Sequence, residues 1–242
     1  MAYLTGFHAI EEHIRAGKTS GVLLVAKAGP RAREIAALAA EKKIRVERAG
    51  VHELDRLAKD HRGVVLEIDG DPSFCGNFEE MLDSLNGKEN ALVVILDEIT
   101  DPHNYGAIIR SCDQFGADMV IIRNKRTARH SDIVAKSSAG AAAWIPIAET
   151  PNLPRAVEAL KAAGFWIYGA DMSGECIFDR NMRGRCAVIF GSEGGGLSRL
   201  LRETCDVLVA VPSLGRIDSL NVSVAAGVVL YEITRQRLQG HH

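Results

Sequence analysis

The chain has 242 residues, of which 25% are charged and 47% hydrophobic, and its formal net charge is -2. This composition is ordinary for a globular protein, and the length permits one large domain or two modest ones. The balance of charges excludes a globally basic surface that would bind nucleic acid, although it says nothing about local patches.

The cysteines and the amino-terminal residues predict the cellular setting. The five cysteines are scattered and include no CxxC pair, which predicts neither a disulfide framework nor a metal site. The first residues carry charges where a signal peptide needs an apolar core, and no segment is long enough to span a bilayer. We therefore expect a cytoplasmic protein with no metal and no membrane partner. The last two residues, His241 and His242, resemble the remnant of an expression tag and receive no role.

Residues 1–70 alternate short helical and strand patterns and predict a small α/β domain. An apolar stripe of Ala9, Ile10 and Ile14 indicates a first helix. Further elements are expected as strands at 22–25, 44–48 and 64–68 and a helix at 33–43. The following stretch, 71–90, contains a proline, glycines and a short amphipathic helix, and it is interpreted as a linker.

From residue 91 onward the pattern becomes regular and predicts an open parallel α/β sheet over 91–242. A continuous apolar run at 91–97 is typical of a strand buried on both faces, and a helix is expected from about 104 to 115. Further strands are expected at 118–123, 144–148, 165–171, 187–191 and 207–211. Ligands bind such sheets beyond the carboxyl ends of the strands.

Three loops rich in glycine, proline and small polar residues follow three of these strands. In the first, EITDPHNYGAIIR, Asn104 and Arg110 lie six residues apart, and both can face one crevice. The alternative is that Asn104 caps the helix and Arg110 makes a surface salt bridge. In the second, GSEGGGLS, four glycines around Glu193 indicate either tight turns or the close approach of a ligand.

The third loop, PSLGRIDSLNVS, is long for a turn between a strand and a helix, which favours a functional role. Ser219 could be a capping hydroxyl and Asn221 a residue of the first helical turn, or both could bind a substrate. No catalytic histidine, cysteine or carboxylate pair competes for the site. This absence favours a reaction in which a cofactor brings the reactivity.

Other stretches carry weaker signals. The basic run 123–129 is either a phosphate contact or a solvated charged segment, and Cys112 is interpreted as a buried hydrophobic residue. The last helix has a broad apolar face that suits burial in a core plus contact with a partner subunit.

Together, DPHNYGAIIR, FGSEGGGLS and VPSLGRIDSLNVSVAAG resemble, in order and spacing, the three signature motifs of the SpoU family of RNA ribose 2′-O-methyltransferases. The stretches GFHAIEEHIRAG and HRGVVLEI resemble the small RNA-binding domain of the bacterial members that methylate a guanosine of 23S ribosomal RNA. Arg216 and Asp218 depart from the pattern, since relatives often carry small neutral residues there.

The resemblance implies a knotted catalytic domain over 91–242, in which the chain threads through its own loop. Periodicity alone does not predict the knot, because true knots are essentially absent from folded chains. The implied cofactor is S-adenosylmethionine, held largely by backbone groups at Gly191, Val211 and Leu220. The implied partners are RNA, 23S ribosomal RNA first among them, and a second copy of the chain, with no DNA.

The resemblance also implies a catalytic set, which comprises Asn104, Arg110, Glu193, Ser219 and Asn221. The family gives Arg110 the activating role, but a guanidinium is effectively always protonated. Either a substrate phosphate bound by Arg110 accepts the proton of the 2′-hydroxyl, or Arg110 stabilises the developing alkoxide. Glu193 has no firm role. Two other functions stay open: methylation of a ribose in transfer RNA, and RNA binding without catalysis.

Overall fold

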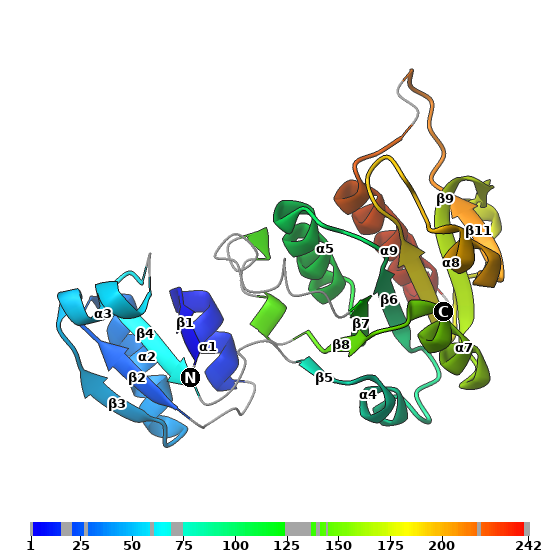
Figure 1. The fold of residues 1–242 in the computed structure, drawn as a ribbon. Helices are drawn as coiled ribbons and strands as arrows, with labels where there is room; N and C mark the ends of the chain where they lie inside the picture. The colour runs from blue at the N-terminus through cyan, green and yellow to red at the C-terminus, as the bar shows by residue number, and fades with distance from the viewer. Residues whose placement is uncertain are drawn as a thin grey trace. The chain divides into compact units, whose positions relative to one another are not determined.

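The computed structural model describes residues 2–15, 21–26, 29–58, 61–68, 75–123, 137–138, 141–143, 145–216 and 219–239. The chain divides into two compact units (Figure 1). The first unit comprises residues 1–74 together with 139–144, and the second comprises 75–138 together with 145–242.

The first unit is a four-stranded sheet with helices. Its described elements are β1 (Ala2–Thr5), α1 (Phe7–Arg15), β2 (Val22–Val25), α2 (Pro30–Glu41), β3 (Arg45–Arg48), α3 (Val51–Leu57), β4 (Val64–Ile68) and the 3-10 turn η1 (Ala141–Ala143). The strand order is β1-β4-β2-β3, with β4 antiparallel to both neighbours and β2 parallel to β3. Ile10, Ile14 and Ile35 are buried in its core, as the predicted helical stripes require. The elements β1 and α3 were not predicted.

The second unit is built on a seven-stranded parallel sheet, which confirms the predicted sheet type. Its described elements are β5 (Cys75–Asn77), α4 (Phe78–Ser84), β6 (Leu92–Leu96), α5 (Pro102–Gln114), β7 (Met119–Arg123), β8 (Ile147–Thr150), α7 (Leu153–Ala162), β9 (Trp166–Cys176), η2 (Ile177–Asp179), β10 (Cys186–Phe190), α8 (Arg199–Thr204), β11 (Val207–Ala210) and α9 (Val222–Gln239). The strand order is β11-β9-β10-β6-β7-β8-β5. None of the helices in the described part of the chain is long and apolar enough to cross a bilayer.

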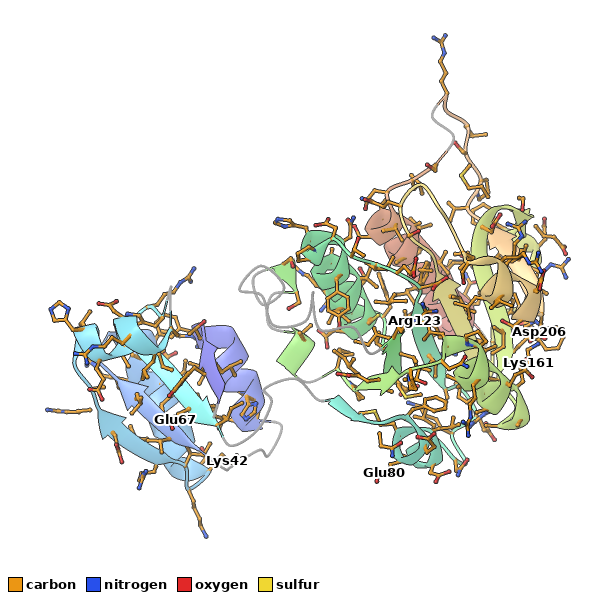
Figure 2. All side chains as sticks on the ribbon, in the orientation of Figure 1. Lys42, Glu67, Glu80, Arg123, Lys161 and Asp206 are labelled. Atoms are coloured by element: carbon orange, nitrogen blue, oxygen red, sulfur yellow. The ribbon has the colours of Figure 1, made fainter. Side chains whose placement is uncertain are left out.

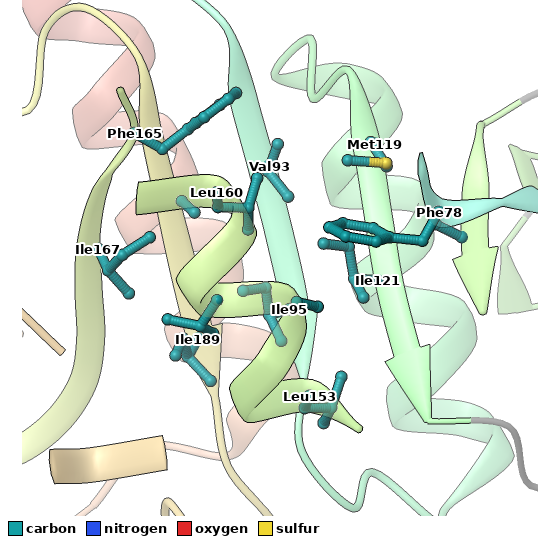
Figure 3. Close-up of a cluster of buried hydrophobic side chains, with 14 of the residues drawn as sticks. Phe78, Val93, Ile95, Met119, Ile121, Leu153, Leu160, Phe165, Ile167 and Ile189 are labelled. Carbon is teal, nitrogen blue, oxygen red and sulfur yellow. The ribbon is translucent and has the colours of Figure 1, made fainter. Parts of the chain in front are cut away.

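Helices cover both faces of this sheet. One face carries Val93, Ile95 and Ile121, and these residues pack against α4, α7 and α8 in one cluster of buried side chains (Figure 3). Neighbouring residues such as Val94 point to the opposite face, because side chains alternate along a strand, and Val94 is also fully buried. The helices α5 and α9 pack against each other, and the hydroxyl of Thr234 in α9 donates to the carbonyl oxygen of Phe115 at 3.2 Å. The sheet is thus buried on both faces, as its unbroken apolar strands predict.

The structure differs from the predicted linker at 71–90. Residues 75–90 belong to the second unit, where β5 pairs with β8 at the edge of the sheet. Phe78 and Leu85 lie seven residues apart and are both buried in the main core. Two helical turns bring residues seven apart to the same face, so α4 is a covering helix of the sheet.

An aspartate holds the start of a neighbouring strand at the amino-terminal edge of the sheet. Asp206, just before β11, accepts a hydrogen bond from the backbone N–H of Ile167 in β9 at 2.8 Å. The ammonium group of Lys161 lies 2.9 Å from the other carboxylate oxygen of Asp206 (Figure 2). Asp118 makes the same contact to Leu92 at the start of β6.

We predict that Asp206→Ala lowers the free energy of unfolding by about 1–3 kcal/mol, because it leaves a partly buried N–H without its acceptor. Lys161→Ala is the matched control and should cost at most about 1 kcal/mol, because it removes only a partly exposed ion pair. Urea unfolding of the three proteins measures both values. Equal losses in the two variants would contradict the assigned role of the strand-end hydrogen bond.

Candidate active site

The carboxyl ends of β6 and β10 lie side by side at the centre of the sheet, since Leu96 is the register partner of Phe190. The first two polar loops leave from these strand ends, and the third leaves from β11, on the far side of β9. We call them loop 1 (97–101), loop 2 (191–198) and loop 3 (211–221).

Loop 1 ends in a capped helix. Asp101 accepts hydrogen bonds from the backbone N–H groups of His103 and Asn104, both at 3.2 Å, and Pro102 occupies the first helical position. The alternative that Asn104 is the cap is therefore wrong. Asn104 lies in the first turn of α5 and is only 8% exposed, so its side chain is free to do something other than capping.

Loop 2 is a tight backbone turn that closes on itself. The backbone groups of Ser192 and Gly196 form reciprocal hydrogen bonds of 3.0 and 2.9 Å. Gly194 and Gly196 have φ angles of +82° and +63°, which favour glycine. A Cβ atom on Gly191 would lie 2.1 Å from the carbonyl group of Gly196. The glycines therefore serve both as turn residues and as sites of close approach, and Glu193 lies exposed in the turn.

Loop 2 is held at its base by a buried carboxylate from loop 1. Asp97 is 1% exposed and accepts a hydrogen bond from the backbone N–H of Ser198 at 2.8 Å. The next residue, Glu98, has a φ angle of +58°, a backbone conformation that residues other than glycine rarely adopt. Its carboxylate lies 3.5 Å from the guanidinium of Arg123. Strained residues of this kind concentrate at functional sites.

Loop 3 ends at Asn221, which caps α9. The side-chain oxygen of Asn221 accepts hydrogen bonds from the backbone N–H of Ser223 at 3.0 Å and of Val224 at 3.4 Å. Its own carbonyl accepts from the N–H of Ala225 at 2.9 Å. Asn221 is the N-cap residue rather than a first-turn residue, and Ser219 lies two positions before it, exposed.

The same asparagine joins loop 3 to loop 2 and to the first turn of α5, which follows loop 1. The side-chain nitrogen of Asn221 donates to the oxygen of the Asn104 amide at 3.0 Å and to a carboxylate oxygen of Glu193 at 2.5 Å. The sequence separations are 117 and 28 residues. Three of the five predicted catalytic residues therefore meet, and we call Asn104, Glu193 and Asn221 the amide–carboxylate cluster.

The other predicted site residues lie outside this cluster. Arg110 is exposed on α5 and has no hydrogen-bond or ion-pair partner among the described residues, so nothing there supports the surface salt bridge. Six residues of helix place Arg110 about 9 Å along the axis from Asn104 and roughly 120° around it. The contacts of the described residues do not bring both side chains to one crevice. Leu220 is exposed, and Val211 is half-buried directly after β11.

Several sequence interpretations concern residues near the site. Burial raises the pKa of the Cys112 thiol well above its ordinary range, which agrees with a small hydrophobic residue in α5 rather than a nucleophile. Of the basic run 123–129, only Arg123 is described, and Asp218 likewise lies outside the described residues. Arg216 is exposed.

Two residues that hold the site loops in place, Asp97 and Asp101, were missed by sequence reasoning. Asp101 had a usable signal, because an aspartate followed by a proline is a typical start of a helix. Asp97 had none, since its partner Ser198 lies 101 residues away.

The loops present groups that suit a small ligand with many polar atoms. The backbone around Gly194 and Gly195 is exposed and bears no side chains, so a ligand can approach its N–H and C=O groups closely. Glu193 supplies a carboxylate beside them. Among the described residues, no group of three or more metal-ligating side chains is present.

Comparison with known proteins agrees with this arrangement. The model of the SpoU rRNA methylase family matches residues 91–231, and the model of an RNA 2′-O ribose methyltransferase substrate-binding domain matches residues 3–73. The 23S rRNA (guanosine-2′-O-)-methyltransferase RlmB of Neisseria meningitidis serogroup B is 40% identical over 239 residues, which are 96% of this chain and 94% of that protein.

Solved structures show the same fold. The SpoU methyltransferase AviRb of Streptomyces viridochromogenes matches 99% of this chain and 90% of its own, with a TM-score of 0.82 and 26% identity. The structure of AviRb in complex with AdoMet matches with a TM-score of 0.76 and 28% identity, over 98% of this chain and 90% of that one.

Proposed function

This chain belongs to the SpoU rRNA methylase family, and we propose that it transfers a methyl group from S-adenosylmethionine to the ribose 2′-hydroxyl of a guanosine in 23S ribosomal RNA. The observation that carries the proposal is the amide–carboxylate cluster, in which Asn221 from the third signature motif is hydrogen-bonded to one residue from each of the other two motifs. The choice of 23S ribosomal RNA and of guanosine is supported by the 40% identical RlmB of Neisseria meningitidis, whose name states that activity. The protein would act in the cytoplasm, where its ribosomal RNA substrate would be found.

Loops 2 and 3 fit S-adenosylmethionine. The tip of loop 2 is hydrogen-bonded to the end of loop 3 through Glu193 and Asn221, so the two loops are joined at these residues. The cofactor would be held by backbone groups at Gly191, Val211 and Leu220, inside a knot made by these two loops. When bound, it supplies an electrophilic methyl group. Its affinity should therefore depend on the path of loop 2 more than on any single side chain.

The remaining residues would act on the RNA. Arg110 is exposed and makes no ion pair with the residues that the structure describes. A guanidinium binds phosphate with two parallel hydrogen bonds. In this role it orients the ribose and stabilises charge on the 2′-oxygen. Ser219 would contact the nucleotide from loop 3, where it is exposed.

A homodimer is part of the proposal. The helix α9 exposes Val224, Tyr231 and Leu238, which lie seven residues apart and thus share one helical face. The ring of Phe115, directly after α5, packs edge-on against Tyr231, with centroids 6.1 Å apart. A second copy covering α5 and α9 would bury this apolar stripe.

The test is a methylation assay with labelled S-adenosylmethionine and separate 23S ribosomal RNA and transfer RNA transcripts, followed by mapping of the label. We expect label on one guanosine of 23S ribosomal RNA, and none when that residue is replaced by its 2′-deoxy form. Label on transfer RNA would favour the alternative substrate. Cofactor binding without methylation of either RNA would favour the RNA-binding protein without catalysis.

The first unit, with the boundary predicted near residue 70, would bind the RNA. In it Lys42 and Lys43, in the turn after α2, and Arg48, at the end of β3, are exposed and make no ion pair with the described residues (Figure 2 labels Lys42). Such cations neutralise phosphates and release counterions on binding.

We predict that the triple charge reversal of Lys42, Lys43 and Arg48 to glutamate weakens RNA binding by at least about tenfold and reduces its salt dependence. Affinity for S-adenosylmethionine should stay at the wild-type value, because every cofactor loop lies in the second unit. Fluorescence anisotropy with a ribosomal RNA fragment and calorimetry with the cofactor measure the two affinities. Unchanged RNA binding would place the RNA surface elsewhere.

A further inference from the structure

The amide of Asn221 has no hydrogen-bonding capacity left for a ligand. Its nitrogen donates both protons, one to Asn104 and one to Glu193. Its oxygen accepts from the backbone N–H of Ser223 at 3.0 Å and from the hydroxyl of Ser223 at 2.6 Å. Because a carboxamide has two N–H donors and two acceptor lone pairs, Asn221 is saturated. It is a positioning residue that fixes the direction of its two partners.

The partners do have free groups. Glu193 uses only one carboxylate oxygen, Oε1, and its Oε2 has no partner among the described residues. Asn104 uses its oxygen and keeps its N–H donors. The cluster therefore presents one acceptor that can take a proton and one neutral donor.

The other titratable groups at this edge of the sheet are engaged, buried away from solvent or unable to accept a proton. Asp97 accepts from Ser198 through Oδ2, and its Oδ1 has no hydrogen-bond partner among the described residues but is buried, where a substrate hydroxyl cannot reach it. Asp101 caps α5. Glu98 is paired with Arg123. A guanidinium such as that of Arg110 stays protonated at every working pH. Among the titratable groups that the structure describes at this edge, this leaves Glu193 and His103, an exposed residue in the first turn of α5.

We propose that Glu193 is the general base of the reaction and that Asn221 holds it in place. This assignment rests on the proposed function. The 2′-O–H bond breaks as the bond from the 2′-oxygen to the methyl carbon forms, while the bond between sulfur and that carbon breaks. The proton goes to Oε2 of Glu193, and the electron pair of the broken carbon–sulfur bond stays on sulfur.

Charge favours a carboxylate in this position. The donor sulfur loses its positive charge in the transfer, and Glu193 loses its negative charge when it takes the proton. The two changes cancel, so the site needs no other counterion for the product. Arg110 keeps its charge throughout and can stabilise the 2′-oxygen electrostatically.

The deciding variant is Glu193→Gln, because the glutamine oxygen can still accept the hydrogen bond from Asn221 but cannot take the proton. We expect kcat to fall by at least about 100-fold, within the range typical for loss of a general base. The KM for RNA, the calorimetric affinity for S-adenosylmethionine and the melting temperature should stay near wild type. The fall of the wild-type rate at acidic pH should be absent from the residual rate of this variant.

Two further variants complete the test. Glu193→Asp keeps the carboxylate and should retain more activity than Glu193→Gln, while His103→Ala should methylate at nearly the wild-type rate. A Glu193→Gln protein that methylates within a few-fold of the wild-type rate overturns the assignment. A Glu193→Gln protein that has lost its affinity for S-adenosylmethionine also overturns it, because the role of Glu193 would then be structural. If the fall of the rate at acidic pH disappears in His103→Ala and persists in Glu193→Gln, the histidine is the base. A wild-type protein that binds cofactor and methylates no RNA overturns the proposed function itself, and this result differs from all the others.

Discussion

Replacement of Arg110 by alanine is expected to lower the methylation rate by at least about 100-fold while the fold and the cofactor affinity survive. Removal of one positioned donor from developing charge costs this much in other enzymes. Arg110 is exposed on α5 and makes no hydrogen bond or ion pair with the described residues, so its loss removes no contact that supports the structure. The cofactor loops belong to other elements.

Arg110→Lys should restore little of the rate, because an ammonium group keeps the charge but lacks the planar fork that binds a phosphate with two hydrogen bonds. Arg155→Ala is the matched control, since Arg155 is also an exposed arginine on a helix, α7, and no signature motif contains it. Single-turnover rates and melting curves for the three variants measure the effect. If Arg110→Ala methylates within a few-fold of wild type, Arg110 has no part in the reaction.

Replacement of Gly191 by alanine is expected to reduce cofactor affinity by more than about tenfold. The new Cβ atom would lie 2.1 Å from the carbonyl carbon and oxygen of Gly196 and 2.4 Å from the nitrogen of Leu197. These are backbone atoms and cannot rotate away as a side chain would. Loop 2 must therefore move, and Glu193 moves with it away from Asn221.

Gly50→Ala is the matched control for this substitution. Its Cβ atom would meet nothing within 4 Å, and Gly50 has φ of -76° and ψ of 151°, which alanine adopts readily. Calorimetric titration with S-adenosylmethionine and thermal unfolding separate a local change in loop 2 from general instability. Wild-type affinity in Gly191→Ala would show that the cofactor does not depend on the closed shape of loop 2.

The parallel sheet was predictable from sequence because strands buried on both faces must be apolar throughout, as β6 and β10 are. The short helix α4 was also predictable from its amphipathic pattern. Nothing in the sequence indicated, however, that this helix belongs to the core of the second unit. Phe78 reads as one apolar residue among acidic neighbours, and only its packing against the sheet shows that the expected linker is partly core. Strand β5 has three residues, too few to show a period.

The sequence by itself determined the fold class and the three motif loops, because apolar periodicity and glycine, proline and asparagine placement act over a few neighbouring residues. It could not decide whether Asn104 and Asn221 serve as caps or as site residues, since both uses suit an asparagine. The tertiary structure decided this differently for each: Asp101 caps α5 in place of Asn104, whereas Asn221 caps α9 and joins the cluster as well. Contacts between residues 117 positions apart depend on the packing of whole elements, and no local pattern in the chain encodes them.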